Sequence, residues 1–215
     1  MNLRFCHLYG NLLNTHGDNG NLLMLQYVAR QLGHEVETTL ISIHDQFDAD
    51  AYDFIFIGGG QDHEQKVVAE DLVSKQDALR EYIENGGCGL AIGGGYQLLG
   101  QYYEAADGQQ VNCAGVLPHY TKRQLNQCYA DRVEVHSDLF NESYVGMENH
   151  YGCTFLGESE QPLGKITTGF GNNGQDQTEG AIYKNIICSY FHGPLLVHNR
   201  HLAKRLVDMI VQNKK

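Results

Sequence analysis

GGCGLAIGGGYQLLG, residues 86–100, is the stretch from which the fold of this chain can be read. Its first two glycines end a preceding helix, and the apolar run 88–92 is long enough to form a buried strand. Three glycines, 93–95, then turn the chain sharply, and a helix begins at Tyr96. Together these pieces predict an elbow, whose apex residue lies at the end of a strand in a backbone conformation that ordinary side chains disfavour.

An elbow of this kind usually presents a nucleophile to the substrate, while the amide groups that follow it stabilise negative charge. Here the apex residue is Gly93, which carries no side chain. The stretch therefore has the backbone pattern of a nucleophile elbow but lacks the nucleophile.

Strand and helix patterns alternate on the N-terminal side of the elbow, which is typical of an α/β fold with a mostly parallel sheet and helices on both faces. Asp18 or Asn19 is positioned to cap the first helix. A glycine run, 58–60, directly follows a strand and leaves backbone N–H groups free for a ligand. The patterns predict strands over 3–8, 35–41 and 53–57, and helices over about 21–32 and about 64–85.

Residues 104–190 have a different composition, rich in Gly, Asn and Gln, with short β-like segments between turns. We interpret them as an antiparallel continuation of the same sheet, within a single domain that covers 1–215. A helix over about 199–212 is predicted near the end of the chain. The β-like segments are 130–136, 153–156, 180–183 and 186–190.

The composition argues against several functional classes. The net charge is −11 with only 15 Lys and Arg, which disfavours nonspecific nucleic-acid binding, since that needs clustered cations. No apolar run approaches the ~18 residues of a membrane span, and the N-terminus shows no signal-peptide pattern. The six cysteines form no C-x-x-C pair, so we expect buried thiols in a cytoplasmic protein without a metal site.

One of the eleven histidines stands out by its position. His192 follows an apolar strand and precedes Gly193 and Pro194, so it lies at a strand end just before a break. A lone histidine in such a place is more often structural than catalytic. An elbow with a histidine base on a neighbouring strand end is, however, the nucleophile–base arrangement of acyl transfer.

Three motifs, GGGQD at 58–62, AIGGGYQLLG at 91–100 and YFHGPLL at 190–196, resemble the class I (triad) glutamine amidotransferases. The chain is most similar to their cobyric-acid-synthase-like branch, and within it to the GatD-type amidotransferase subunit of lipid II isoglutaminyl synthase. This resemblance implies a flavodoxin-like, three-layer fold whose substrate is L-glutamine. The motifs of that subunit type are matched at 8–21, 146–157 and 169–185.

The resemblance implies a role for each residue of the reaction centre. The family elbow reads C-G-G-Y-Q, so Gly93 stands where the nucleophilic cysteine belongs, and His192 matches the general base. The residues that match the oxyanion hole are Gly58, Gly59 and Gly94.

Substrate recognition is also implied by the resemblance. Gln97 closes the elbow motif and is expected to bind glutamine. Arg123 corresponds to an arginine whose guanidinium makes a bidentate pair with the glutamine α-carboxylate, and Arg132 is the nearby alternative.

Gly93 departs from the family pattern, because glycine cannot form a thioester. Either the position has been changed from cysteine or the chain is a natural noncatalytic relative. We favour an introduced change, because every other site motif is retained and removal of a nucleophile is a usual way to trap substrate. We expect that this chain hydrolyses no glutamine and that Gly93→Cys, with its partner, does.

The second departure concerns the carboxylate that orients the base. Many triad amidotransferases carry a glutamate two residues after the histidine, where this chain has Pro194. The resemblance suggests an aspartate supplied by the partner, and Glu148 is an alternative within the chain.

The resemblance also names a partner. Ammonia would pass to a MurT-type, Mur-ligase-like subunit in a heterodimer, which uses ATP and Mg²⁺ to amidate the D-glutamate of lipid II to D-isoglutamine. Nothing in this sequence resembles an ATP site, so no cofactor is expected here. The alternatives are a cobyric-acid-type amidotransferase, a noncatalytic glutamine-binding subunit, and a generic flavodoxin-like module, which leaves the motifs unexplained as a set.

Overall fold

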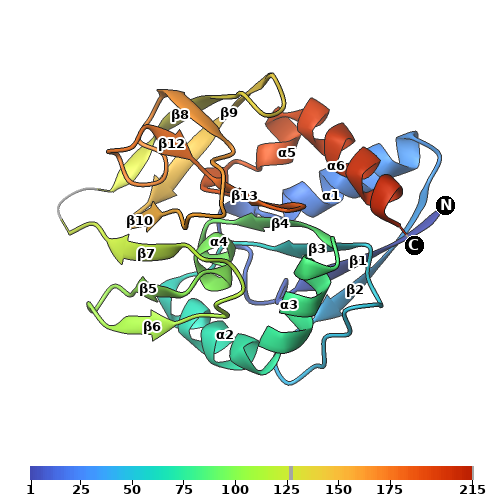
Figure 1. Cartoon of the computed structure of the whole chain (residues 1–215), viewed down its shortest axis with the longest axis horizontal. Helices are drawn as coiled ribbons and strands as arrows, with labels where there is room; N and C mark the ends of the chain where they lie inside the picture. The colour runs from blue at the N-terminus through green and yellow to red at the C-terminus, as the bar shows by residue number, and fades with distance from the viewer. Residues whose placement is uncertain (126–127, 215) are drawn as a thin grey trace.

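A computed structural model describes residues 1–125 and 128–214 of the chain. Its centre is a six-stranded sheet in the order β13-β14-β4-β3-β1-β2 (Figure 1). Every neighbouring pair is parallel except β13 and β14, so the expected mostly parallel central sheet is confirmed. The strands are β1 (Asn2–Leu8), β2 (Glu35–Ile41), β3 (Phe54–Ile57), β4 (Cys88–Ile92), β13 (Ala181–Tyr183) and β14 (Ile186–Ser189).

Helices cover both faces of this sheet because its central strands are apolar on both sides. Along β3, Phe54 and Phe56 face one helical layer, whereas Ile55 and Ile57 face the other. The two layers lie on opposite sides of the sheet in Figure 1. One contains α1 (Asn19–Gln31), α5 (Leu195–His198) and α6 (Arg200–Asn213), and the other contains α2 (Asp62–Ser74), α3 (Gln76–Glu84) and α4 (Gly94–Leu99).

The single long helix predicted over 64–85 is two helices, because the chain breaks at Lys75 between α2 and α3. The Lys75 side chain turns inward at this break. Its ammonium pairs with Asp71 and lies 5.3 Å from the centroid of the Tyr9 ring. The break between the two helices therefore contains a buried cation with both of its partners in place, which the helical pattern did not predict.

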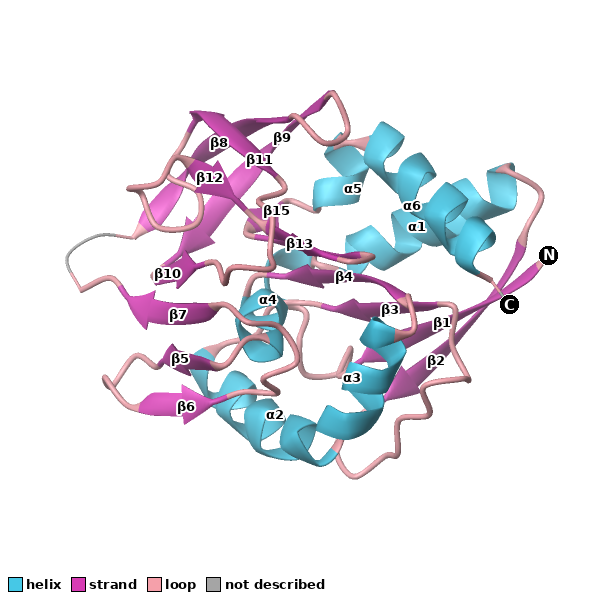
Figure 2. Ribbon diagram, in the orientation of Figure 1, coloured by secondary structure: helices cyan, strands magenta, loops and turns pink. Residues whose placement is uncertain are grey.

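The expectation of one continuous antiparallel extension through 104–190 is wrong for most of that region. Only β13 continues the central sheet, and the other strands form two further sheets, with the orders β10-β7-β5-β6 and β12-β11-β8-β9-β15 (Figure 2). Their strands are β5 (Tyr102–Glu104), β6 (Gln110–Asn112), β7 (Tyr120–Arg123), β8 (Tyr129–Ser137), β9 (Glu142–His150), β10 (Gly152–Phe155), β11 (Gly164–Thr168), β12 (Thr178–Glu179) and β15 (Phe191–His192).

The chain passes from the central sheet to the β8–β9 sheet at Tyr190. β14 ends at Ser189, and the next strand, β15, pairs with β9 so that His192 lies opposite Met147. The buried carboxyl group of Glu179 accepts hydrogen bonds from the Tyr190 N–H at 2.7 Å and from the Ser189 hydroxyl at 3.2 Å. This passage places His192 beside the end of β4 rather than within the central sheet.

Within the described residues, no helix combines the length and the apolar character needed to cross a bilayer.

Candidate active site

The elbow has the backbone that the glycine pattern predicts. β4 ends at Ile92, α4 begins at Gly94, and Gly93 between them has φ 55° and ψ −114°, in the region that favours glycine. Gly95 meets a different need, because a Cβ there would lie 2.5 Å from the carbonyl oxygen of Ile57. The glycines therefore permit both the sharp turn and the close packing of α4 on the end of β3.

His192 faces the apex of the elbow. A Cβ added to Gly93 would lie 2.9 Å from Cε1 and 3.2 Å from Nε2 of the imidazole. The ring is buried, with 5% of the residue exposed. Any side chain at position 93 thus begins in contact with the edge of the ring that carries Nε2.

Asp18, which the sequence suggested as a helix cap, contacts His192 instead. Its Oδ1 lies 3.0 Å from Nδ1 of the imidazole, and its Oδ2 accepts the N–H of Gly59 at 2.8 Å. A carboxylate at Nδ1 favours the tautomer with the proton on Nδ1, which leaves the lone pair of Nε2 directed toward the elbow. A carboxylate in position to orient the base therefore lies within this chain.

Glu148, the in-chain alternative suggested by the sequence, does not contact His192. Its two carboxylate oxygens accept the backbone N–H groups of Phe170 and Gly171, at 2.6 and 2.8 Å. The alternative was wrong because the Glu148 carboxylate is occupied by this loop.

The glycine loop after β3 touches the elbow, but its amides are not all free. A Cβ on Gly59 would lie 3.4 Å from the Gly94 nitrogen, so the two segments are adjacent. The Gly59 N–H is already bound to Asp18, which corrects the expectation that it is an oxyanion donor. Within residues 1–125 and 128–214, the amides of Gly60 and Gly94 donate to no protein acceptor. They are the available donors beside the apex.

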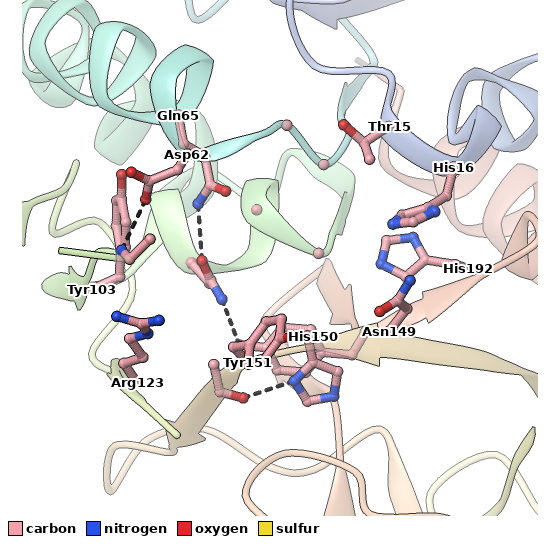
Figure 3. Close-up of a pocket in the computed structure, with 18 of the residues that line it drawn as sticks. Thr15, His16, Asp62, Gln65, Tyr103, Arg123, Asn149, His150, Tyr151 and His192 are labelled. Atoms are coloured by element: carbon pink, nitrogen blue, oxygen red, sulfur yellow. Dashed lines mark hydrogen bonds between the residues drawn. The ribbon is translucent and has the colours of Figure 1, made fainter. Parts of the chain in front are cut away.

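A cavity of about 420 Å³ lies in front of the elbow (Figure 3). It brings together most of the predicted site residues, while Gly58 lies behind it, where a Cβ would meet the carbonyl oxygen of Leu13 at 2.6 Å. Arg132 is also outside, since its guanidinium is exposed and pairs with Glu134. The predicted residues that line the cavity are Gly59, Gly93, Gly94, Gln97, Arg123 and His192.

The far end of the cavity carries charge of both signs. Figure 3 shows the Arg123 guanidinium on the side opposite His192. Glu104 lines the same end, and its Oε2 accepts the backbone N–H of Arg123 at 3.0 Å. Among the described residues, the guanidinium forms no ion pair. A small molecule with both a carboxylate and an ammonium group matches this end.

Gln97 belongs to a chain of hydrogen bonds along the wall of the cavity. Its Oε1 accepts from Gln65 Nε2 at 2.9 Å, and its Nε2 donates to the Tyr190 hydroxyl at 3.1 Å. Burial raises the pKa of Tyr190 to about 12, so this phenol keeps its proton near neutral pH. The arrangement fixes the orientation of the Gln97 amide.

Sequence reasoning also missed His16, which lies at the mouth of the cavity. Its ring centroid is 4.6 Å from that of His192, and its backbone has a positive φ of 59°. Partial burial, and then the neighbouring imidazole, lower the pKa of His16 from its usual value. No motif marked this residue, because its proximity to His192 depends on the folded loop after β1.

Comparisons with known proteins identify the family of this chain. Residues 4–200 match the family model described as a CobB/CobQ-like glutamine amidotransferase domain. The chain is 50% identical over 212 residues to the lipid II isoglutaminyl synthase (glutamine-hydrolyzing) subunit GatD of Streptococcus pneumoniae, covering 99% of this chain and 82% of that one. Its identity to the Staphylococcus aureus subunit of the same name is 36%, covering 99% and 86%.

The fold also matches solved structures. A crystal structure of a glutamine amidotransferase aligns with a TM-score of 0.64 at 15% identity, covering 96% of this chain and 98% of that one. At this identity the likeness establishes the fold alone, and it agrees with the expected class I architecture.

Proposed function

This chain belongs to the CobB/CobQ-like glutamine amidotransferase family, and on that premise we propose that it is the glutamine-binding, GatD-type subunit of a lipid II isoglutaminyl synthase. One observation carries the proposal: the elbow apex and the imidazole of His192, which the buried carboxylate of Asp18 contacts, meet in one cavity whose far end presents Arg123. With cysteine at position 93, this arrangement fits the hydrolysis of L-glutamine.

Glutamine would lie along the cavity with its two ends recognised differently. The α-carboxylate pairs with Arg123, and Glu104 accepts a hydrogen bond from the α-ammonium group. The side-chain carbonyl then points to the elbow, where the amides of Gly60 and Gly94 are free to hold its oxygen.

The reaction requires a thiol at position 93. The thiolate would attack the carboxamide carbon, and the amides beside the apex would stabilise the oxyanion. His192 Nε2 would take the thiol proton and deliver it to the departing ammonia, while Asp18 stabilises the imidazolium. Water would then release glutamate from the thioester. With Gly93 the first bond cannot form, so the chain is expected to bind glutamine without hydrolysing it.

The released ammonia would pass to a partner subunit. We assign that role to a MurT-type, Mur-ligase-like protein in the cytoplasm, which would bind ATP and Mg²⁺ and activate the D-glutamate of lipid II. The support for a partner is that both relatives are named as subunits of a synthase.

Two measurements test this function. Titration calorimetry on the chain with Gly93 should show saturable binding of L-glutamine, and Arg123→Gln should weaken it. An ammonia-release assay should then show turnover for Gly93→Cys but not for Gly93→Cys combined with His192→Ala. A Gly93→Cys chain that binds glutamine yet releases no ammonia, alone or with the partner, would contradict the assignment of the elbow.

A further inference from the structure

We propose that Gln65 is the residue that distinguishes the carboxamide of glutamine from the carboxylate of glutamate. This inference rests on the proposed function, because it assumes that the cavity binds glutamine with its side chain toward the elbow. It concerns an atom outside the elbow, Oε1 of Gln65, whose hydrogen-bonding capacity is unused.

Gln65 is held against the residue that follows the apex. It lies in the first turn of α2, directly after the glycine loop, and only 7% of the residue is exposed. A Cβ on Gly94 would lie 2.6 Å from Cδ and 2.7 Å from Oε1 of Gln65. The absence of a side chain at position 94 thus allows the Gln65 amide to pack directly on the start of α4.

The orientation of this amide is set by its neighbours. Gln65 Nε2 donates to Gln97 Oε1 at 2.9 Å, Gln97 Nε2 donates to the Tyr190 hydroxyl at 3.1 Å, and that hydroxyl lies 2.6 Å from Oγ1 of Thr154. Because the NH₂ group of Gln65 is committed to Gln97, the end of the amide next to Gly94 is its carbonyl oxygen. Figure 3 shows the Gln65 oxygen on the arm of the amide that carries no dashed hydrogen bond.

Oε1 of Gln65 is an acceptor that lacks a donor. Within the described residues it receives no hydrogen bond, although the side chain is buried and lines the cavity. Because Oε1 is not among the fully buried side-chain atoms without a partner, it is open to the cavity, where a bound ligand that carries an N–H group could donate to it.

The two polar groups beside the apex, one donor and one acceptor, are complementary to a carboxamide. The Gly94 amide offers a donor for the carbonyl oxygen, and Gln65 Oε1 offers an acceptor for the NH₂ group. Glutamate places a charged oxygen where glutamine has its nitrogen, so an acceptor would face an acceptor. A site built to accept from a ligand NH₂ group rejects the analogue that lacks it, because the buried acceptor is left unpaired.

The chain with Gly93 allows this preference to be measured at equilibrium, because bound glutamine is not consumed. Titration calorimetry with L-glutamine and with L-glutamate gives the ratio of the two dissociation constants. Gln65→Met keeps the length of the side chain but removes the acceptor, and we expect it to reduce that ratio by about tenfold, mainly through weaker glutamine binding.

Two further variants complete the test. Gln65→Glu retains an acceptor at this position and removes the NH₂ group, so the preference for glutamine should persist or increase. Gln61→Met is the matched control, because Gln61 is exposed, precedes α2 and does not line the cavity. It should leave both dissociation constants unchanged.

The outcomes separate this inference from the function on which it rests. If the chain binds neither amino acid, the proposed function fails and the inference with it. If glutamine binds but Gln65→Met weakens glutamine and glutamate equally, or leaves their ratio unchanged, the role of Gln65 is refuted while the proposed function stands. A loss of the preference in Gln65→Glu would show that the NH₂ group, rather than the oxygen, contacts the ligand, and would also overturn the inference.

Discussion

Replacing Gly93 by alanine should lower the free energy of unfolding by about 2–4 kcal/mol. Glycine-to-alanine changes at compatible positions usually stabilise, by about 0.4–1 kcal/mol, because they restrict the unfolded chain. Gly93 is not compatible, since its φ of 55° and ψ of −114° lie in a region where other residues are strained by about 1–3 kcal/mol. The new Cβ would also stand 2.9 Å from Cε1 of His192, so the ring must shift, at a cost of about 1 kcal/mol.

Urea unfolding followed by circular dichroism measures this loss, with linear extrapolation to water. Gly108→Ala is the matched control, because Gly108 has a φ of +82° but nothing within 4 Å of its Cβ position. It should lose about 1 kcal/mol, from backbone strain alone. The reasoning would be refuted if Gly93→Ala were as stable as the parent chain, or no less stable than Gly108→Ala. If it holds, Gly93→Cys should gain hydrolysis and lose stability together.

Three further perturbations test other parts of the site. In the Gly93→Cys background, Asp18→Asn should lower the rate of glutamine hydrolysis by about 10²–10⁴-fold, measured as ammonia release, because His192 loses the carboxylate that orients it. Arg123→Gln, in the chain with Gly93, should weaken glutamine binding by about 10–100-fold in calorimetry, because the α-carboxylate loses its cationic partner. Burial raises the pKa of Glu179 from 4.5 to about 8, so the folded chain retains a proton that the unfolded chain releases, and stability should fall as pH rises toward 8. Between pH 6 and pH 9 this loss should be about 2–3 kcal/mol in urea unfolding, and Glu179→Gln should remove most of it.

The sequence predicts the central sheet well, because its inner strands are short apolar runs and β2 alternates in sequence. The strands over 35–41 and 88–92 are found as predicted, and the one over 53–57 begins one residue later. The predictions fail where a polar residue is buried with a partner that the sequence cannot show. Lys75 falls inside the single helix predicted over about 64–85, yet the chain breaks there and its side chain is buried in an ion pair with Asp71.

The candidate site likewise contains residues that the local sequence marks and a residue that it does not. Gly93, Gly94 and His192 are marked by local sequence, because a glycine elbow and a strand-end histidine require particular residue types at fixed spacing. Asp18 is not, because its contact with His192 spans 174 positions of the chain and exists only in the folded structure. Its place before a helix favoured the commoner role of an N-cap, but its side chain makes no capping hydrogen bond.

The passage of the chain at Tyr190 has a consequence for local motion. His192 belongs to the sheet that contains β9, whereas Asp18 and Gly93 adjoin strand ends of the central sheet, so the Asp18–His192 hydrogen bond joins two sheets of the fold. Breaking that hydrogen bond would remove a contact between the two sheets as well as the contact that orients His192. Amide hydrogen exchange along β15 would therefore report on the same interaction as turnover, and it can be measured in the chain with Gly93 without any reaction being followed.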